Sequence, residues 1–554
     1  MPQTTGSLYF AEALKAKGIS HVFIVPTILT PSLAHLDRMG VRVVTAHSEK
    51  AAAYMADGYG RASGRPGICA AQTIGASNLA AGLRDAKLAC APLIAITGGP
   101  VPETRHRHVY QEIDDFPLFE PLCKSNAQID GVSRLPDLLR QAFRDATSGC
   151  PGPVHLQIAG HFGQAIDVEA ELDACYEPQF AKVPAVRPRA EDHRVREAAQ
   201  VLQSARRPVL VAGGGVRSSG AHAEVVQLAQ KLSIPVATSL NAKGTVREDH
   251  DLSVGVVGWY SRSCANRIVT EADLVFFIGS HTGGQVTNRY QVPRPGARVM
   301  QLDIDASELG RNYANVCSVC GDAKLVLQQL IEVAAEGRPD EAWLAHVRDT
   351  VGAWRANSEP LLRSDAVPIR PERLCADLQS CLPEDAVLVS DTGHSGMWTG
   401  IYVELNQPDQ QYLRAAGSLG WALPASIGIK CALPDRPVVC FTGDGGFYYH
   451  MAELETALRY DIPIVVVVND NHALNQETQI FKDAWGGEQR TGLEMWQFRD
   501  LDLAKVAQSM GWRAQRVEKP GDIRPALAEA LACGGPALVD VATDIEALAP
   551  DPVK

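Results

Sequence analysis

Short runs of β-branched residues alternate with helical segments along the whole chain, and this alternation starts afresh three times. In the first block, His21 to Val25 and Leu93 to Thr97 read as strands, whereas Glu49 to Ala62 has helical composition and spacing. Such alternation is typical of parallel sheets covered by helices. We therefore expect an α/β protein with three doubly wound parallel-sheet domains.

Two connecting segments separate the three blocks. A stretch rich in proline and charge, 177–192, follows the first block, and a helical, charged connection at about 337–371 follows the second. A chain of 554 residues is also too long for a single hydrophobic core. The predicted domain boundaries are 1–170, 190–340 and 370–548.

Composition narrows the partners. The net charge of −12 disfavours nucleic acid or an anionic membrane, because both require a basic surface. No apolar stretch approaches the ~20 residues that span a bilayer, and no secretion signal is visible, so we expect a cytoplasmic protein. The 13 cysteines are scattered, and the one close pair, Cys317 and Cys320, lacks a second pair at zinc-site spacing. Reduced, buried thiols are the expectation.

Two strand ends in the third block carry the strongest chemical pattern. Gly443–Gly446 (Gly-Asp-Gly-Gly) follows one apolar run, and Asn469–Ala473 (Asn-Asp-Asn-His-Ala) follows another. The carboxyl ends of parallel strands share one edge of a sheet, so Asp444, Asn471 and the Ala473 carbonyl are expected to surround one point. Hard oxygen ligands of this kind suit Mg²⁺, with diphosphate and water completing the shell. Gly-Asp-Gly alone would favour a plain turn; the paired asparagines favour a metal site.

This pairing resembles the signature of thiamine-diphosphate enzymes. The order of the three blocks is similar to the acetohydroxyacid-synthase-like superfamily of acetolactate synthases, benzaldehyde lyases and 2-oxo acid decarboxylases, and the resemblance covers nearly the whole chain. It implies a pyrimidine-binding domain, a central domain and a diphosphate-binding domain, with thiamine diphosphate and Mg²⁺ as cofactors.

The resemblance also implies roles for individual residues. Glu49 falls on the family's catalytic glutamate, which shares a proton with the aminopyrimidine; from the residues alone it would be a carboxylate at a helix start. Leu419 falls on the apolar residue that bends the cofactor, although such a leucine is usually core. The implied catalytic residues are Glu49, Gln111 and Glu477. The implied cofactor contacts are Pro26, Asn78, Thr392, His394, Met397, Ser418, Leu419, Gly443, Asp444, Gly445, Gly446, Asn471, Ala473, Leu474 and Asn475. The implied substrate contacts are Thr27, Thr73, His108, Gln111 and Ile480.

The implied reaction makes or breaks a carbon–carbon bond next to a carbonyl. In carboligation, a 2-oxo acid loses CO₂ and the resulting enamine attacks a second carbonyl compound; the lyase reaction is the reverse on a 2-hydroxy ketone. A simple decarboxylase releasing an aldehyde is the alternative, and Glu477 falls where such enzymes carry an acid. Ile480 falls where acetohydroxyacid synthases place a tryptophan. A non-catalytic relative would predict damage at Glu49, Asp444 or Asn471, and all three are intact.

Two further expectations concern the central block and assembly. Gly213–Gly215 lacks the spacing of a dinucleotide fingerprint, and a tight strand-to-helix turn is preferred. The segment 279–286 differs from that of flavin-bearing synthases, so FAD is possible but not favoured. In the family, two subunits build each site, which implies a homodimer or homotetramer.

Overall fold

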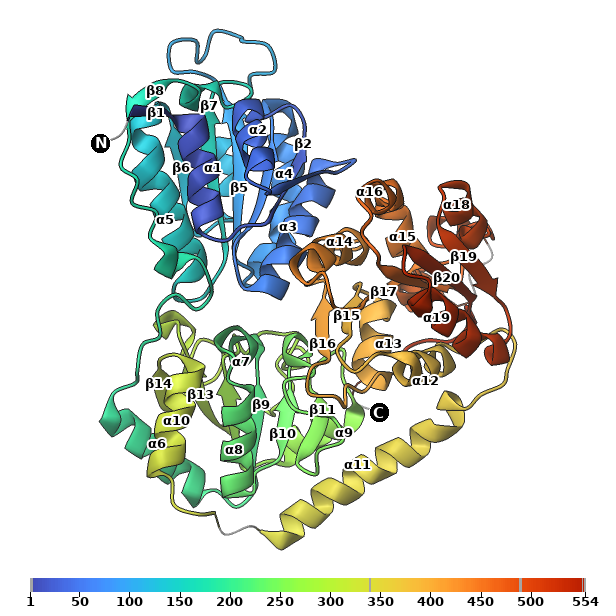
Figure 1. The fold of residues 1–554 in the computed structure, drawn as a ribbon. Helices are drawn as coiled ribbons and strands as arrows, with labels where there is room; N and C mark the ends of the chain where they lie inside the picture. Colours follow the sequence, from blue (N-terminus) through green and yellow to red (C-terminus); the bar gives the residue numbers. More distant parts are fainter. Residues whose placement is uncertain (1–2, 338–339, 488–490, 551, 553–554) are drawn as a thin grey trace.

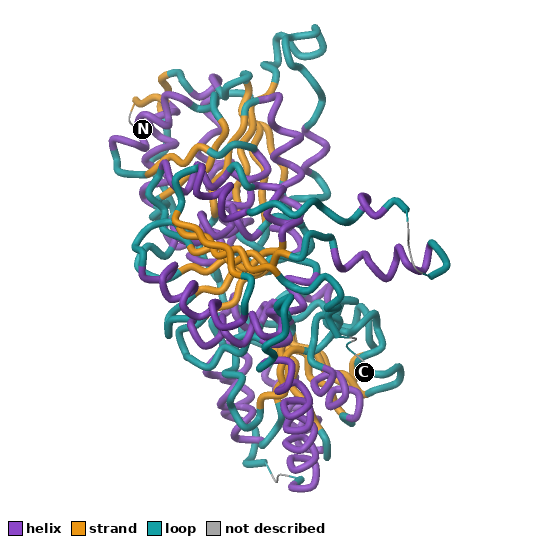
Figure 2. The backbone as a smooth tube through the Cα atoms, turned by 90° about the vertical axis from the view of Figure 1, so that its right-hand side faces the viewer, coloured by secondary structure: helices purple, strands orange, loops and turns teal. Residues whose placement is uncertain are grey.

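The computed structural model describes residues 3–337, 340–487, 491–550 and 552. These residues form three sheets of six parallel strands, each flanked by helices (Figures 1 and 2). The predicted fold class, α/β with three doubly wound parallel-sheet domains, is confirmed.

The first domain has the strand order β3-β2-β4-β5-β7-β6. Its strands are β2 (His21–Val25), β3 (Arg42–Thr45), β4 (Gly67–Ala71), β5 (Leu93–Gly99), β6 (Asn126–Ile129) and β7 (Pro153–Ala159). Its helices are α1 (Gly6–Ala16), α2 (Thr30–Arg38), α3 (Glu49–Ser63), α4 (Ala76–Leu88) and α5 (Leu135–Thr147). A small antiparallel pair, β1 (Gln3–Thr5) and β8 (Glu169–Glu171), lies beside them.

The central domain has the order β11-β10-β9-β12-β13-β14. Its strands are β9 (Pro208–Ala212), β10 (Val236–Thr238), β11 (Ser253–Val256), β12 (Leu274–Ile278), β13 (Arg298–Asp303) and β14 (Asn315–Cys320). Its helices are α6 (Asp192–Ser204), α7 (Gly214–Ser219), α8 (His222–Leu232), α9 (Ser263–Glu271) and α10 (Ala323–Val333). The long helix α11 (Glu341–Leu362) connects it to the third domain (Figure 1).

The third domain has the order β16-β15-β17-β18-β20-β19. Its strands are β15 (Val387–Ser390), β16 (Gln411–Arg414), β17 (Val438–Gly443), β18 (Val465–Asp470), β19 (Arg513–Val517) and β20 (Ala537–Ala542). Its helices are α12 (Pro371–Cys381), α13 (His394–Tyr402), α14 (Ala422–Ala432), α15 (Asp444–His450), α16 (Glu453–Arg459), α17 (Thr478–Ala484), α18 (Leu503–Ser509) and α19 (Ile523–Ala532).

Local sequence explains the elements that position the site. Every residue of β18 is buried, as the unbroken apolar run before Asn469 requires for a strand covered on both faces. Helix α3 begins where the Ser48 hydroxyl accepts the Ala51 N–H, and it ends at Gly64, which adopts the left-handed conformation at φ 70°. The Glu49 carboxyl is thereby fixed at the first turn of a capped helix.

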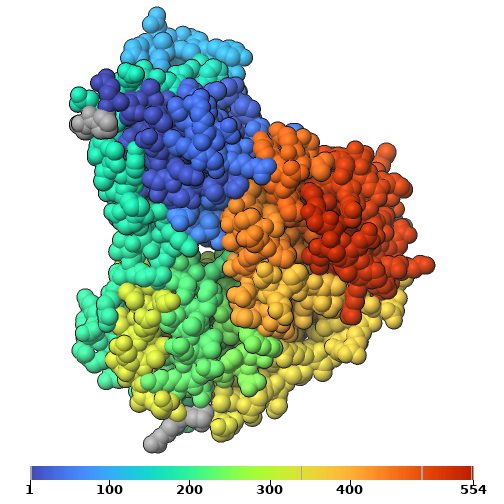
Figure 3. Space-filling model, in the orientation of Figure 1, coloured from blue at the N-terminus to red at the C-terminus, as the bar shows by residue number. Residues whose placement is uncertain are grey.

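The first and third domains share one hydrophobic core because α3 packs directly against α14. A Cβ atom on Gly58 would lie 2.3 Å from the Ala425 carbonyl oxygen, and one on Gly428 would lie 1.8 Å from the Met55 carbonyl oxygen. Both glycines are therefore required for this close helix contact. Figure 3 shows the three domains as lobes that meet around a central hollow.

Within the described residues, no helix combines the length and the apolar character needed to cross a bilayer.

Candidate active site

A cavity of about 400 Å³ opens at the carboxyl ends of β15, β17 and β18. Its lining comes from four segments of the third domain and from two residues of the central domain. The lining residues are Tyr260, Gln285, Thr392, Gly393, His394, Ser395, Arg414, Ala416, Gly417, Leu419, Gly443, Asp444, Gly445, Gly446, Asn469, Asn471, Ala473, Leu474, Asn475, Gln476 and Glu477. Ligands of open parallel sheets bind at this edge.

The two motifs of the third domain meet on one side of this cavity. Strands β17 and β18 are neighbours, with Gly443 paired to Asn469, so Asp444 and Asn471 follow adjacent strand ends. Asp444 is 2% exposed, and its Oδ2 atom has no hydrogen-bond partner within the described residues; the same holds for Oδ1 of Asn471. Buried acceptors without partners are costly. Two such oxygens at one cavity wall fit a bound cation.

Asp470 and His472 complete this acidic corner, and the sequence reasoning did not single them out. Ligand atoms of Asp444, Asp470 and His472 all lie within 4.8 Å of one another. Asp470 accepts the His472 N–H at 3.2 Å through Oδ1, whereas its Oδ2 atom lies 3.6 Å from the Arg516 guanidinium and has no hydrogen-bond partner within the described residues. The signal was available, because Asp470 stands between the two asparagines of the motif.

The electrostatics of Asp444 favour a cation as well. Burial, and then the nearby charge of Asp470, raise the pKa of Asp444 well above its ordinary value, although backbone N–H groups of Gly445 and Ala473 oppose the shift. A divalent cation would offset both the burial and the repulsion. The residues present therefore fit Mg²⁺ with a diphosphate: Asp444, Asn471 and the Ala473 carbonyl would hold the metal.

Asp391, which the sequence reasoning did not single out either, organises two of the loops that line the cavity. Its buried carboxyl accepts backbone N–H groups of Thr392 at 2.8 Å, Gly420 at 3.0 Å and Ala422 at 3.2 Å. These bonds tie the loop after β15 to the loop before α14, which carries Leu419. Burial raises the pKa of Asp391 to about 6.

His394 lines the cavity as a neutral imidazole. Burial lowers the pKa of His394 to about 4, and its Nδ1 atom has no hydrogen-bond partner within the described residues. Met397 lies one turn further along α13 and is buried in the hydrophobic core, outside the cavity lining. Ser418 also lies outside the lining, although its neighbours Gly417 and Leu419 belong to it.

A buried polar network from the first domain holds the loop that carries Leu419. Asp85 of α4 accepts the backbone N–H groups of Ala416 at 2.8 Å and Ser418 at 2.9 Å. Arg61 of α3 pairs with Asp85 at 2.9 Å, and Asp57 accepts the Trp421 indole N–H at 2.7 Å. The first domain thus holds in place a loop that lines the cavity of its own chain.

The catalytic candidate Glu49 lies elsewhere. Its carboxylate accepts the Asn78 amide at 2.6 Å, and a Cβ atom on Gly75 would lie 2.6 Å from Glu49 Oε1, so a side chain at position 75 would displace the Glu49 carboxylate. Pro26 and Thr27, just after β2, are exposed, whereas Thr73 is buried. Among the described residues, none of the first domain lines the cavity of the third.

The remaining predicted substrate contacts lie on projecting segments. His108 and Gln111 belong to the loop between β5 and the short helix Phe116–Phe119, which extends from the top of the first domain (Figure 1). Both have positive φ, 57° and 63°, and Tyr110 between them is 79% exposed. Ile480 on α17 is 63% exposed and does not line the cavity. Glu477, just before α17, does line it.

The fold and this site define a thiamine-type α/β enzyme, with a pocket at the carboxyl edge of the sheet of its third domain. Residues 4–118, 195–330 and 391–541 match the N-terminal TPP binding domain, the central domain and the C-terminal TPP binding domain of thiamine pyrophosphate enzymes. The chain belongs to this thiamine-diphosphate-dependent, acetohydroxyacid-synthase-like superfamily.

Relatives match along nearly their whole length. A probable acetolactate synthase large subunit of Methanocaldococcus jannaschii is 34% identical, covering 97% of this chain and 92% of that protein. The corresponding protein of Methanococcus aeolicus is 32% identical, with the same coverage. The acetolactate synthase isozyme 1 large subunit of Escherichia coli is 30% identical, covering 98% of this chain and 94% of that protein.

Proposed function

We propose that this protein is a thiamine-diphosphate- and Mg²⁺-dependent carboligase that joins a 2-oxo acid to a second carbonyl compound with loss of CO₂. The observation that carries the proposal is the pair of buried, unpartnered oxygens of Asp444 and Asn471 in the 400 Å³ cavity. Their position supports a metal–diphosphate site, and the full-length similarity to acetolactate synthase large subunits favours carboligation.

The chain's own residues bind and orient the cofactor. Asp444, Asn471 and the Ala473 carbonyl would hold Mg²⁺, while the backbone N–H groups of Gly445 and Gly446, which line the cavity, would donate to diphosphate oxygens. The apolar Leu419 would support the middle of the cofactor. Thiamine diphosphate, when bound, supplies a carbon nucleophile and accepts the electron pair of the bond that breaks.

Glu49 would exchange the catalytic proton with a ring nitrogen of the pyrimidine. Its carboxylate accepts the Asn78 amide, and Gly75, which has no side chain, lies beside it. A glutamine at position 49 would keep that shape but could not transfer the proton.

Each site would be completed by a second copy of the chain. Glu49 belongs to the first domain, and no described residue of that domain lines the cavity of its own chain. Large apolar side chains are exposed on both half-sites: Ile74, Tyr110 and Ile113 on the first domain, and Ile480, Trp485 and Met495 on the third. Apolar groups at both half-sites support a symmetric dimer in which they are covered.

Mixing two inactive variants tests this arrangement. In a mixed dimer of Glu49→Gln and Asp444→Ala chains, one of the two shared sites contains both native residues. Random association makes half the dimers mixed, so about a quarter of wild-type activity should return. A site built within one chain would remain inactive after mixing, which would refute the shared site while leaving the cofactor assignment intact.

Product analysis tests the reaction itself. Purified protein with thiamine diphosphate and Mg²⁺ should convert pyruvate, alone or with an acceptor, to a coupled 2-hydroxy ketone or acetohydroxyacid. If neither coupled product forms and only aldehyde and CO₂ are released, the carboligase proposal is overturned.

A simple decarboxylase is the second candidate, because the carboxyl-bearing Glu477 lines the cavity where a proton donor would stand. Glu477→Gln should then slow aldehyde release, with Asp483→Asn on the neighbouring helix α17 as the matched control. An unchanged rate in Glu477→Gln would exclude this role.

A further inference from the structure

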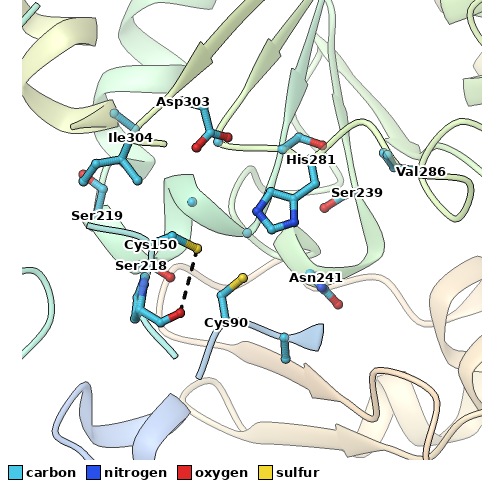
Figure 4. Close-up of a pocket in the computed structure, with 18 of the residues that line it drawn as sticks. Cys90, Cys150, Ser218, Ser219, Ser239, Asn241, His281, Val286, Asp303 and Ile304 are labelled. Atoms are coloured by element: carbon cyan, nitrogen blue, oxygen red, sulfur yellow. Dashed lines mark hydrogen bonds between the residues drawn. The ribbon is translucent and has the colours of Figure 1, made fainter. Parts of the chain in front are cut away.

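Three potential metal ligands meet where the first domain contacts the central domain, outside the active-site cavity. The Sγ atoms of Cys90 and Cys150 and a ring nitrogen of His281 all lie within 4.8 Å of one another. Figure 4 shows their side chains converging from separate segments onto one cavity. That cavity has a volume of about 360 Å³ and is also lined by Asp303 and Ile304 of the central domain.

The parallel sheet places the two cysteines together. Cys90 and Cys150 each stand three residues before a strand position, and those positions, Leu93 of β5 and Pro153 of β7, are paired in register. The two thiols therefore belong to neighbouring turns at the amino edge of the first sheet. Because 60 positions of sequence separate the two cysteines, no short motif along the chain indicates that they lie together.

Cys90 occupies a backbone position that favours glycine. It follows α4 with φ 53°, and the next N–H, of Ala91, bonds to the Ala86 carbonyl at 2.9 Å, which closes the helix end. A side chain in the left-handed region costs about 1 kcal/mol or more. A cysteine here, where glycine would be less strained, directs a thiol into the cavity.

The third group is presented by the central domain. His281 lies in the loop after β12, and the Asn312 amide donates to the carbonyl oxygens of His281 and Thr282, each at 3.1 Å. These hydrogen bonds hold the loop within the central domain. Asp303, at the end of β13, lies on the same cavity wall.

The three side chains are of the kind that thiophilic cations prefer. Two thiols and one imidazole, with their ligand atoms within 4.8 Å of one another, form a set of soft ligands.

We propose that Cys90, Cys150 and His281 bind a thiophilic divalent metal ion such as Zn²⁺, with the fourth coordination position open to the cavity. Zinc–sulfur bonds of about 2.3 Å place the sulfurs of a tetrahedral site about 3.8 Å apart, so only a small closure of the cluster is needed. Thiolates and a neutral imidazole are the forms that bind the metal, so binding releases every proton that the two thiols and the imidazolium hold. The ion joins the first domain to the central domain and is separate from the oxygen-ligand site at Asp444.

Cobalt titration tests the site. Full-length protein, stripped with chelator and kept reduced, is titrated with Co²⁺, whose bonds to thiolate give near-ultraviolet charge-transfer absorption that oxygen ligands do not. We expect one equivalent per chain, displaced by Zn²⁺. Cys90→Ser, Cys150→Ser and His281→Ala should each weaken Co²⁺ binding at least about tenfold. Cys175→Ser and Cys320→Ser, which alter exposed cysteines outside the cluster, and Asp444→Ala should leave the band unchanged.

A second substitution separates ligation from folding. His281→Cys supplies another soft ligand and should restore the thiolate band that His281→Ala loses. Absence of the band in wild-type protein, or its survival in Cys90→Ser, would overturn the proposal. A Cys90–Cys150 disulfide in the purified protein would be detected by mass spectrometry as the loss of two hydrogens. If the same protein, once fully reduced, still bound no Co²⁺, the proposal would be overturned too.

Discussion

Replacing Asp444 with asparagine should stabilise the cofactor-free protein while abolishing its response to cofactor. Ligand atoms of Asp444 and Asp470 lie within 4.8 Å. Two unit charges at that distance repel by about 3.5 kcal/mol at an effective dielectric constant of ~20. The Arg516 guanidinium near Asp470 and partial protonation of Asp444 reduce this repulsion. A gain of about 1–3 kcal/mol in the free energy of unfolding of the third domain remains.

The sign depends on pH. Because the pKa of Asp444 is raised in the folded protein, the folded state holds a proton that the unfolded state has released. Stability of the cofactor-free protein therefore falls as pH rises through the folded-state pKa of Asp444. Asp444→Asn removes this loss, so its advantage over wild type should be larger in a mildly alkaline buffer than in a mildly acidic one.

Thermal unfolding in chelator, and then with Mg²⁺ and thiamine diphosphate, measures both effects. A gain of 1 kcal/mol raises the melting temperature by about 2–4 °C for a domain of this size. Cofactor at about 100 times its Kd should add about 2.7 kcal/mol to the wild type and nothing to the variant. A variant that melts below wild type in chelator, or that keeps the cofactor response, would refute the reasoning.

Three other outcomes are expected. Mg²⁺-dependent cofactor affinity should rise with pH, because the proton on Asp444 competes with the metal; a flat profile by calorimetry from pH 5 to 8, a window of about three units, would contradict this. Asp85→Asn should destabilise the protein by about 3–5 kcal/mol and weaken cofactor binding, because Arg61 and the loop N–H groups lose a charged acceptor; the exposed Asp435→Asn is the control for both measurements. Gly428→Ala should unfold at least several degrees lower, because its Cβ atom would lie 1.8 Å from the Met55 carbonyl oxygen, whereas Gly352→Ala in α11, with open space around it, should be neutral or stabilising.

The sequence by itself determined the fold class and one half of the candidate site. Strand and helix periodicity can be read from local sequence, and so can the position of Asp444 and Asn471 directly after apolar runs. Because parallel strands have their carboxyl ends at one edge of the sheet, this local information brings the two residues together. The cavity accordingly contains Thr392, His394, Leu419 and the glycines at 443, 445 and 446, as well as Glu477. Their chemical roles stay predictions.

Only the tertiary structure decided which distant groups meet. Asp391 and Asp85 became visible as organisers of the Leu419 loop because their hydrogen bonds connect loops and domains far apart in sequence. The separation of Glu49 from the cavity likewise depends on how whole domains dock. Cys90, Cys150 and His281 come together through strand register in one domain and a loop of another, and no spacing rule along a chain records such contacts.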